Sequence, residues 1–184
     1  MKKTTLLILL LLVLLFLSGC YAYVSKFLTT RHITKLPSFP RAYQIQEDDS
    51  FPDAKQVSKV INIFYSHWKA EFGDESERVS ETLNSIMIDW GEKPKRGSGH
   101  SLQGRSLNGV IRGITMTPGY IWVWKGVHNK LSSTSLVHEL IHCAIWANNS
   151  HCDPDHEGTE YEGWTRAHTE FLFKINYLLE DMNM

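Results

Sequence analysis

The sequence predicts an α+β domain in which a small antiparallel sheet packs against flanking helices. Two observations indicate this fold class. Apolar residues recur at spacings of three and four over several separate segments, which is typical of amphipathic helices. Between these segments, residues 109–124 are rich in β-branched and aromatic residues, which is typical of strands. The chain has 184 residues, which is enough for one domain with a core of its own.

Two helices are predicted at the start of this domain. The stretch "SFPD" offers Ser50 as an N-cap and Asp53 as its capping-box partner. Gly73 ends the first helix, whose apolar positions are Val57, Val60, Ile61, Phe64, Trp68 and Phe72. The second helix is expected over residues 75–90 and stops at Gly91.

A long loop and two short strands are expected next. Residues 91–109 contain five glycines and no apolar period, which indicates a loop. Residues 109–124 predict two strands that are interrupted at Pro118 and Gly119. Because side chains alternate along a strand, one face should carry three aromatic residues, Tyr120, Trp122 and Trp124. We expect this aromatic face to pack in the core rather than to bind substrate.

Two further helices complete the predicted domain. Ser132 or Ser133 can cap the first of them, and Asn148 and Asn149 end it. After a loop, the last helix runs from about residue 164 to residue 179. Its inward positions are Trp164, Phe171, Leu172, Ile175, Leu178 and Leu179.

The helix that ends at Asn149 carries the segment "LVHELIHCAIW", with His138, Glu139 and His142 inside an apolar run. Burying such side chains is costly unless something pairs with them. The two histidines are four residues apart, so they lie on one helix face and can reach one ion at about 2.0–2.1 Å. Glu139 lies about 100° around the helix, where it can reach a water on that ion as a general base. The alternative is a surface helix with two solvated histidines, which the apolar flanks disfavour.

A catalytic zinc site needs a third protein ligand and keeps its fourth position for water. His156 follows His142 by 14 residues, which lets the chain leave the helix and return, so His156 is our first candidate. A solvated loop histidine is the alternative interpretation of His156. The other candidates for the third ligand are His168, Glu157, Glu160, Glu162 and Glu170.

The N-terminus predicts export and a lipid anchor. Two lysines precede an apolar run of 12 residues, Leu6 to Leu17, which fits a signal peptide and is short for a membrane span of roughly 20. The run ends in "LSGC", which resembles the lipobox of bacterial lipoproteins and implies cleavage before Cys20 and lipidation of its thiol. A plain signal peptide or a signal anchor is the alternative.

The predicted organisation is a lipoprotein signal peptide over residues 1–19, a lipidated N-terminus and tether over 20–50, and the folded domain over 51–184. The lipobox implies the cell envelope as location. By the same resemblance, Tyr21 in place of an aspartate implies the outer membrane, on its periplasmic side, if the cell has two membranes. A net charge of -1 gives no general attraction to nucleic acid.

Cys143 and Cys152 remain if Cys20 is lipidated. An oxidising compartment permits a disulfide between them, which would close a short loop and steady the segment that carries His156. Two buried thiols are the alternative, since the geometry of the pair is not set by the sequence.

The segment "HELIH" and the downstream His156 resemble the zincins, the HExxH metallopeptidases. A leader strand, the motif helix, a loop with a histidine and a tryptophan-bearing helix are similar to SprT-type domains, although "DHEGTEYEGW" and the lipobox depart from them. The resemblance implies a zincin-like fold, Zn²⁺ held by His138, His142 and His156, Glu139 as the catalytic base, and a protein or peptide substrate. Two alternatives stay open, a zinc-binding adaptor lipoprotein that does no hydrolysis and a zinc hydrolase of cell-wall amides.

Overall fold

The computed structural model describes four ranges of the chain, residues 31–48, 51–97, 109–149 and 163–184. The chain divides into two compact units, Met1–Arg31 and His32–Met184, and the described strands and helices all belong to the second. The predicted signal peptide and Cys20 lie outside the described residues. Within the described ranges, no helix combines the length and the apolar character needed to cross a bilayer.

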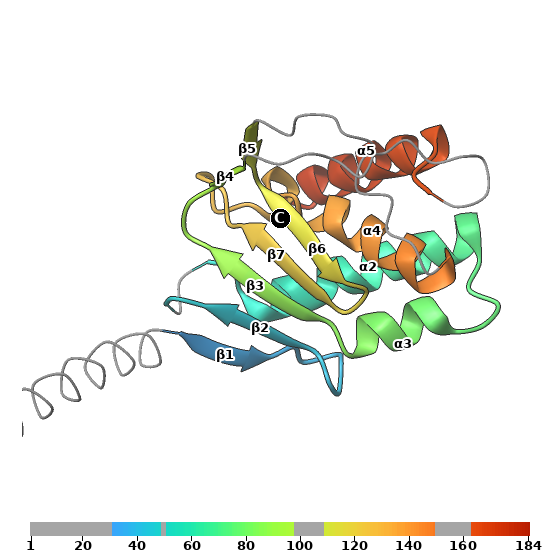
Figure 1. The fold of residues 1–184 in the computed structure, drawn as a ribbon, viewed down its shortest axis with the longest axis horizontal. Helices are drawn as coiled ribbons and strands as arrows, with labels where there is room; N and C mark the ends of the chain where they lie inside the picture. Colours follow the sequence, from blue (N-terminus) through green and yellow to red (C-terminus); the bar gives the residue numbers. More distant parts are fainter. Residues whose placement is uncertain (1–30, 49–50, 98–108, 150–162) are drawn as a thin grey trace, which may run out of the picture. The chain divides into compact units, whose positions relative to one another are not determined.

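The fold is α+β, with a small mixed sheet whose five strands have the order β1-β2-β3-β7-β6 (Figure 1). The strands are β1 His32–Lys35, β2 Tyr43–Gln46, β3 Met87–Gly91, β6 Gly113–Thr117 and β7 Tyr120–Trp124. The outer pairs, β1 with β2 and β6 with β7, are antiparallel, whereas β2, β3 and β7 run parallel. The prediction of an antiparallel sheet is therefore wrong for the three central strands, β2, β3 and β7. Two helices lie between β2 and β3 in the chain, and such a crossover joins parallel strands.

Strands β1 and β2 lie inside residues 20–50, for which the sequence predicted a tether, so the predicted domain start at residue 51 is too late. Their sequences hide the usual signal of a strand. In β2 the buried side chains are Gln44 and Gln46, and in β1 Ile33 is 70% exposed. Because the polar residues are buried and the apolar one is exposed, no apolar period marks these strands.

Helix α2, Ala54–Phe72, follows the prediction closely, and Gly73 ends it with a positive φ of 77°. Its N-cap differs from the prediction. The carboxylate of Asp53 accepts hydrogen bonds from the backbone N–H groups of Lys55 and Gln56 and so caps the helix itself. Asp53 is thus the cap rather than the capping-box partner of Ser50.

Helix α3, Arg78–Asn84, is much shorter than predicted, because Met87–Gly91 form strand β3. The apolar positions of this segment fit a helix, but Ile88 and Trp90 also alternate as in a strand. Pairing with β2 on one side and β7 on the other decides in favour of the strand. The loop predicted after it holds a second, two-stranded sheet of β4 Lys95–Gly97 and β5 Gly109–Ile111.

Helix α4 spans Leu136–Asn149 and ends where predicted. Its predicted caps belong instead to a preceding 3₁₀ turn, Leu131–Ser133, and the hydroxyl oxygen of Thr134 accepts the N–H of Leu136. Helix α5 spans Arg166–Asp181 and begins with a capping box formed by Thr165 and His168. Trp164, which was predicted to open this helix, precedes it and is buried.

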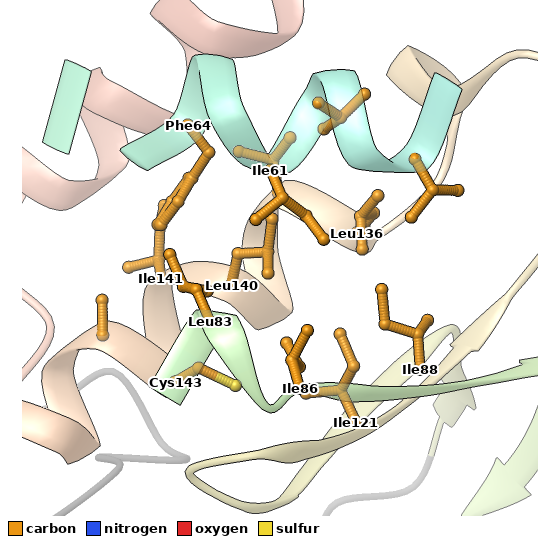
Figure 2. Close-up of a cluster of buried hydrophobic side chains, with 14 of the residues drawn as sticks. Ile61, Phe64, Leu83, Ile86, Ile88, Ile121, Leu136, Leu140, Ile141 and Cys143 are labelled. Atoms are coloured by element: carbon orange, nitrogen blue, oxygen red, sulfur yellow. The ribbon is translucent and has the colours of Figure 1, made fainter. Parts of the chain in front are cut away.

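Helices α2 and α4 cover one side of the central strands, and the hydrophobic core lies between these layers (Figures 1 and 2). The core is formed by side chains such as Ile61 and Phe64 of α2, Leu140 and Ile141 of α4, Ile88 of β3 and Ile121 of β7. This core holds α4 against the sheet. It therefore also sets the position of the α4 side chains at the edge of the core, such as His138.

The aromatic side chains of β7 lie on the sheet face away from this core. Ile121 and Val123 point into the core, so the alternation of the strand turns Trp122 to the other face. Trp122 is nevertheless only 4% exposed. The Lys95 ammonium lies 4.1 Å from its ring centroid. Trp122 is therefore buried, as predicted, but on the face of the sheet opposite to the hydrophobic core.

Candidate metal centre

The two histidines of the "HELIH" segment bring their Nε2 atoms close together. On α4 they lie one turn apart, and their Nε2 atoms are 3.2 Å from each other. In a tetrahedral site with nitrogen ligands at about 2.0–2.1 Å, two such atoms are separated by about 3.3–3.4 Å. The ring centroids are 4.9 Å apart and the ring planes differ by 67°. His138 and His142 therefore have the spacing of two ligands to one ion.

The apolar residues around these histidines hold the helix in place. Leu136, Val137, Leu140 and Ile141 are fully buried. His142 is itself buried, while His138 is half-buried at the margin of the core. The alternative of a surface helix with two solvated histidines does not fit this burial.

Glu139 is almost fully enclosed, with 3% of its surface exposed. Thr115 of β6 donates a hydrogen bond of 2.7 Å to the carboxylate Oε2. Burial raises the pKa of Glu139 to about 7, although the Thr115 hydrogen bond acts in the opposite direction by favouring the charged form. A carboxyl group with a pKa near neutrality can both accept and donate a proton at physiological pH.

Strand β6 can approach Glu139 because residue 113 is glycine. A Cβ atom at Gly113 would lie 2.8 Å from both Cγ and Cδ of Glu139, which is closer than real contacts allow. Gly113 and Thr115 are two residues apart, so they share the face of β6 that meets α4. Gly113 leaves room for the carboxylate of Glu139, and Thr115 donates a hydrogen bond to it.

Trp164 covers both imidazole rings. The centroid of its ring lies 4.8 Å from that of His138 and 4.9 Å from that of His142. Its indole N–H donates a 2.8 Å hydrogen bond to the hydroxyl oxygen of Thr169. The three rings form a contiguous cluster between α4 and the start of α5.

His168, one alternative for the third ligand, has a structural role in α5. Its Nδ1 accepts the backbone N–H of Thr165 at 2.9 Å and so caps the helix. Its ring stacks on Phe72 and Trp68 at centroid distances of 4.6 and 5.5 Å. Burial lowers the pKa of His168 from its usual value. These contacts account for His168 without a metal.

The remaining candidates divide into one exposed residue and several that the structure does not describe. Glu170 is exposed on α5 and pairs with Arg166 at 2.8 Å, which favours a surface role. His156, the predicted third ligand, lies outside the described residues, as do Glu157, Glu160 and Glu162.

The donor set at α4 suits zinc in kind, because imidazole nitrogen is one of its common ligands. In the described ranges there is no group of three or more His, Cys, Asp or Glu residues placed to hold an ion. His138 and His142 thus form a two-ligand set that fits Zn²⁺ in spacing. The third position stays a prediction for His156.

Cys143 does not belong to this set. It is fully buried in the hydrophobic core (Figure 2), where its side chain lies near Leu83 and Ile86. The helical period predicts that it lies on the other side of α4 from His138, and its position in the core agrees with that. Cys152 lies outside the described residues, so the disulfide between Cys143 and Cys152 stays a prediction.

Three residues of this site were not assigned to it by the sequence. Gly113 and Thr115 come from a strand far from the motif in the chain, and Trp164 was expected only to pack inward. One signal was available, since a glycine inside a strand often marks a close approach of another group. Nothing in the sequence showed that this group is Glu139.

Comparison of the chain with protein-family models, with curated proteins and with solved structures finds no match. The class that the structure itself defines is an α+β domain with a mixed sheet. A functional assignment therefore depends on the chemistry of the side chains around α4.

Proposed function

We propose that the protein is a lipid-anchored, zinc-dependent metallopeptidase of the bacterial cell envelope, with a zincin-like domain. The observation that carries this proposal is the 3.2 Å separation of the Nε2 atoms of His138 and His142, on the helix that also carries the buried carboxyl group of Glu139. Two imidazoles with the spacing of metal ligands and a carboxyl group on the same helix are two parts of a site for metal-assisted hydrolysis, and a third protein ligand completes it. Cys20 would carry the anchor, on the outer membrane if the cell has two membranes.

The protein side chains divide the work between binding and proton transfer. His138 and His142 would hold the ion, with His156 as the predicted third ligand. Zinc, when bound, lowers the pKa of water and polarises a carbonyl group. Glu139 would accept the proton of the attacking water and deliver it to the leaving amine, and the burial that raises its pKa makes it a better proton acceptor. The hydrogen bond from Thr115 keeps its carboxylate in one orientation.

The position of β6 favours a peptide as the substrate. β6 is the terminal strand of the five-stranded sheet, and its inner face meets Glu139 through Gly113 and Thr115. An extended peptide can pair with such an edge through backbone hydrogen bonds. A peptide bound there would pass beside Glu139 and the two histidines.

The test is the substitution Glu139→Gln in the full-length chain purified in detergent. We expect the wild type to contain one zinc ion per chain and to cleave an unstructured protein or a fluorogenic peptide. The variant should keep its zinc and lose activity by about 10²–10⁴-fold, because proton transfer is lost. Glu170→Gln is the matched control, since Glu170 is an exposed glutamate on α5, and it should change neither property.

The alternatives give different results in the same assay. A wild type that holds zinc but cleaves neither proteins nor peptidoglycan contradicts the peptidase and favours the adaptor. Cleavage of peptidoglycan amides alone favours the cell-wall hydrolase. A wild type without zinc, even after the metal is supplied, refutes the proposal as a whole.

A further inference from the structure

We infer that Trp164 is a positioning residue, which holds the imidazoles of His138 and His142 in their converging orientation and thereby raises the affinity of the site for its divalent cation. The inference rests on the proposed function only in requiring that these two histidines bind one ion. It concerns a side chain that donates no ligand atom.

One indole contacts two imidazoles. The ring planes of Trp164 and His138 differ by 35°, and those of Trp164 and His142 by 46°, at centroid distances below 5 Å in both pairs. Trp164 is only 6% exposed, so the indole fills enclosed space. A histidine on a helix has several staggered rotamers. The indole occupies space into which either imidazole could otherwise turn.

The indole itself is held by the last helix. Its N–H donates to Thr169 on the first turn of α5, and Thr165 between them caps that helix. Helix α5 is anchored in the core by Phe171, whose ring meets Phe64 of α2 edge-on at 5.6 Å. The orientation of the indole is therefore set by a packed helix rather than by a loose loop.

The consequence is a preorganised pair of ligands. Imidazole rings that already lie in the binding orientation lose less conformational freedom when an ion binds than rings that must first change rotamer. Residues that orient metal ligands without touching the ion commonly change metal affinity by about 10–100-fold. Trp164 acts on two ligands at once, so its removal should have a measurable effect on binding.

The experiment measures zinc affinity of the full-length chain in detergent, by competition with a chromophoric chelator. We expect Trp164→Leu to weaken zinc binding by about tenfold or more. Trp164→Phe, which keeps an aromatic ring over the imidazoles, should stay within about threefold of the wild type. Cobalt(II) absorption gives a second measurement, since the ligand-field bands of the wild type should change in Trp164→Leu and be recovered in Trp164→Phe.

Trp90→Leu is the matched control. Trp90 is at least as deeply buried as Trp164, but it lies on β3, where its ring meets Phe51 and its indole N–H donates to Gln44. Its substitution should lower the melting temperature without weakening zinc binding in the folded protein. An equal loss of zinc affinity in Trp90→Leu and Trp164→Leu would show general loosening and overturn the inference.

The remaining outcomes are also decisive. If Trp164→Leu binds zinc as tightly as the wild type, Trp164 only fills space, while the proposed metallopeptidase stands. A wild type that binds no zinc overturns the inference together with the proposed function. If Trp164→Leu does not fold, Trp164→Met decides, because methionine fills much of the same space but lacks the ring that meets both imidazoles. Unchanged zinc affinity in Trp164→Met then refutes the positioning role.

Discussion

Gly113→Ala tests whether β6 and α4 are as close as the structure shows. The added methyl group would lie 2.8 Å from Cγ and Cδ of Glu139, and a contact of that length cannot persist. Either β6 moves away from α4 or the carboxylate of Glu139 moves from its position. In both cases the hydrogen bond between Thr115 and Glu139 should weaken.

The expected magnitude follows from two effects. Overpacking of a buried contact costs typically about 1–3 kcal/mol. A hydrogen bond to a charged group contributes about 1.5–3 kcal/mol, of which part would be lost as the geometry relaxes. We expect the free energy of unfolding to fall by about 2 kcal/mol, which corresponds to a lower melting temperature by about 4–8 °C for a chain of this size. Hydrolysis should fall more steeply than stability, because the general base itself is displaced.

The assay combines thermal unfolding, zinc content and peptide cleavage. Zinc content should be unchanged, because the atoms nearest to the new methyl group belong to Glu139 and not to a metal ligand. Gly109→Ala is the matched control, since Gly109 is also a strand glycine and a Cβ atom added there would meet no atom of the described residues within 4 Å. It should alter stability by less than about 0.5 kcal/mol. Wild-type stability and activity in Gly113→Ala would refute the close contact between β6 and Glu139.

Two other predictions concern the protonation of Glu139. Burial raises its pKa from 4.5 to about 7, so the folded state holds this proton more tightly than the unfolded state. In metal-free protein, stability should therefore fall as the pH rises from 4.5 to 7, by on the order of 3 kcal/mol, and urea titrations of Glu139→Gln should show no such fall. Thr115→Val removes the hydrogen bond that lowers this pKa, so the pH at which peptide cleavage reaches half of its maximum should move upward. A pH profile unchanged in Thr115→Val, or a parallel fall in Glu139→Gln, would contradict the respective prediction.

The sequence predicted what depends on local periodicity. Helix α2 and the end of α4 were found because their apolar positions recur over several turns, and the pairing of His138 with His142 follows from the same period. The structure places these two side chains where the helix geometry requires.

The sequence could not predict what depends on distant partners. β2 buries Gln44 and Gln46. The Gln44 amide nitrogen donates hydrogen bonds to the backbone oxygen of Pro52 and to the side chain of Gln46. Polar residues therefore line the buried face of this strand, where the sequence would lead one to expect apolar residues. β3 has spacings that fit both a helix and a strand, and its two sheet neighbours decide between them. The same limit applies at the site, where Thr115 and Trp164 meet α4 only through the tertiary fold.

The most direct test of the central claim is X-ray absorption at the zinc edge, on the full-length chain loaded with one equivalent of Zn²⁺. If His138 and His142 bind one ion, the spectrum shows imidazole nitrogen ligands at about 2.0–2.1 Å, and their number falls by one in His138→Ala and in His142→Ala. Spectra of both variants that match the wild type, or zinc that is lost on simple dialysis, would contradict the metal centre on α4.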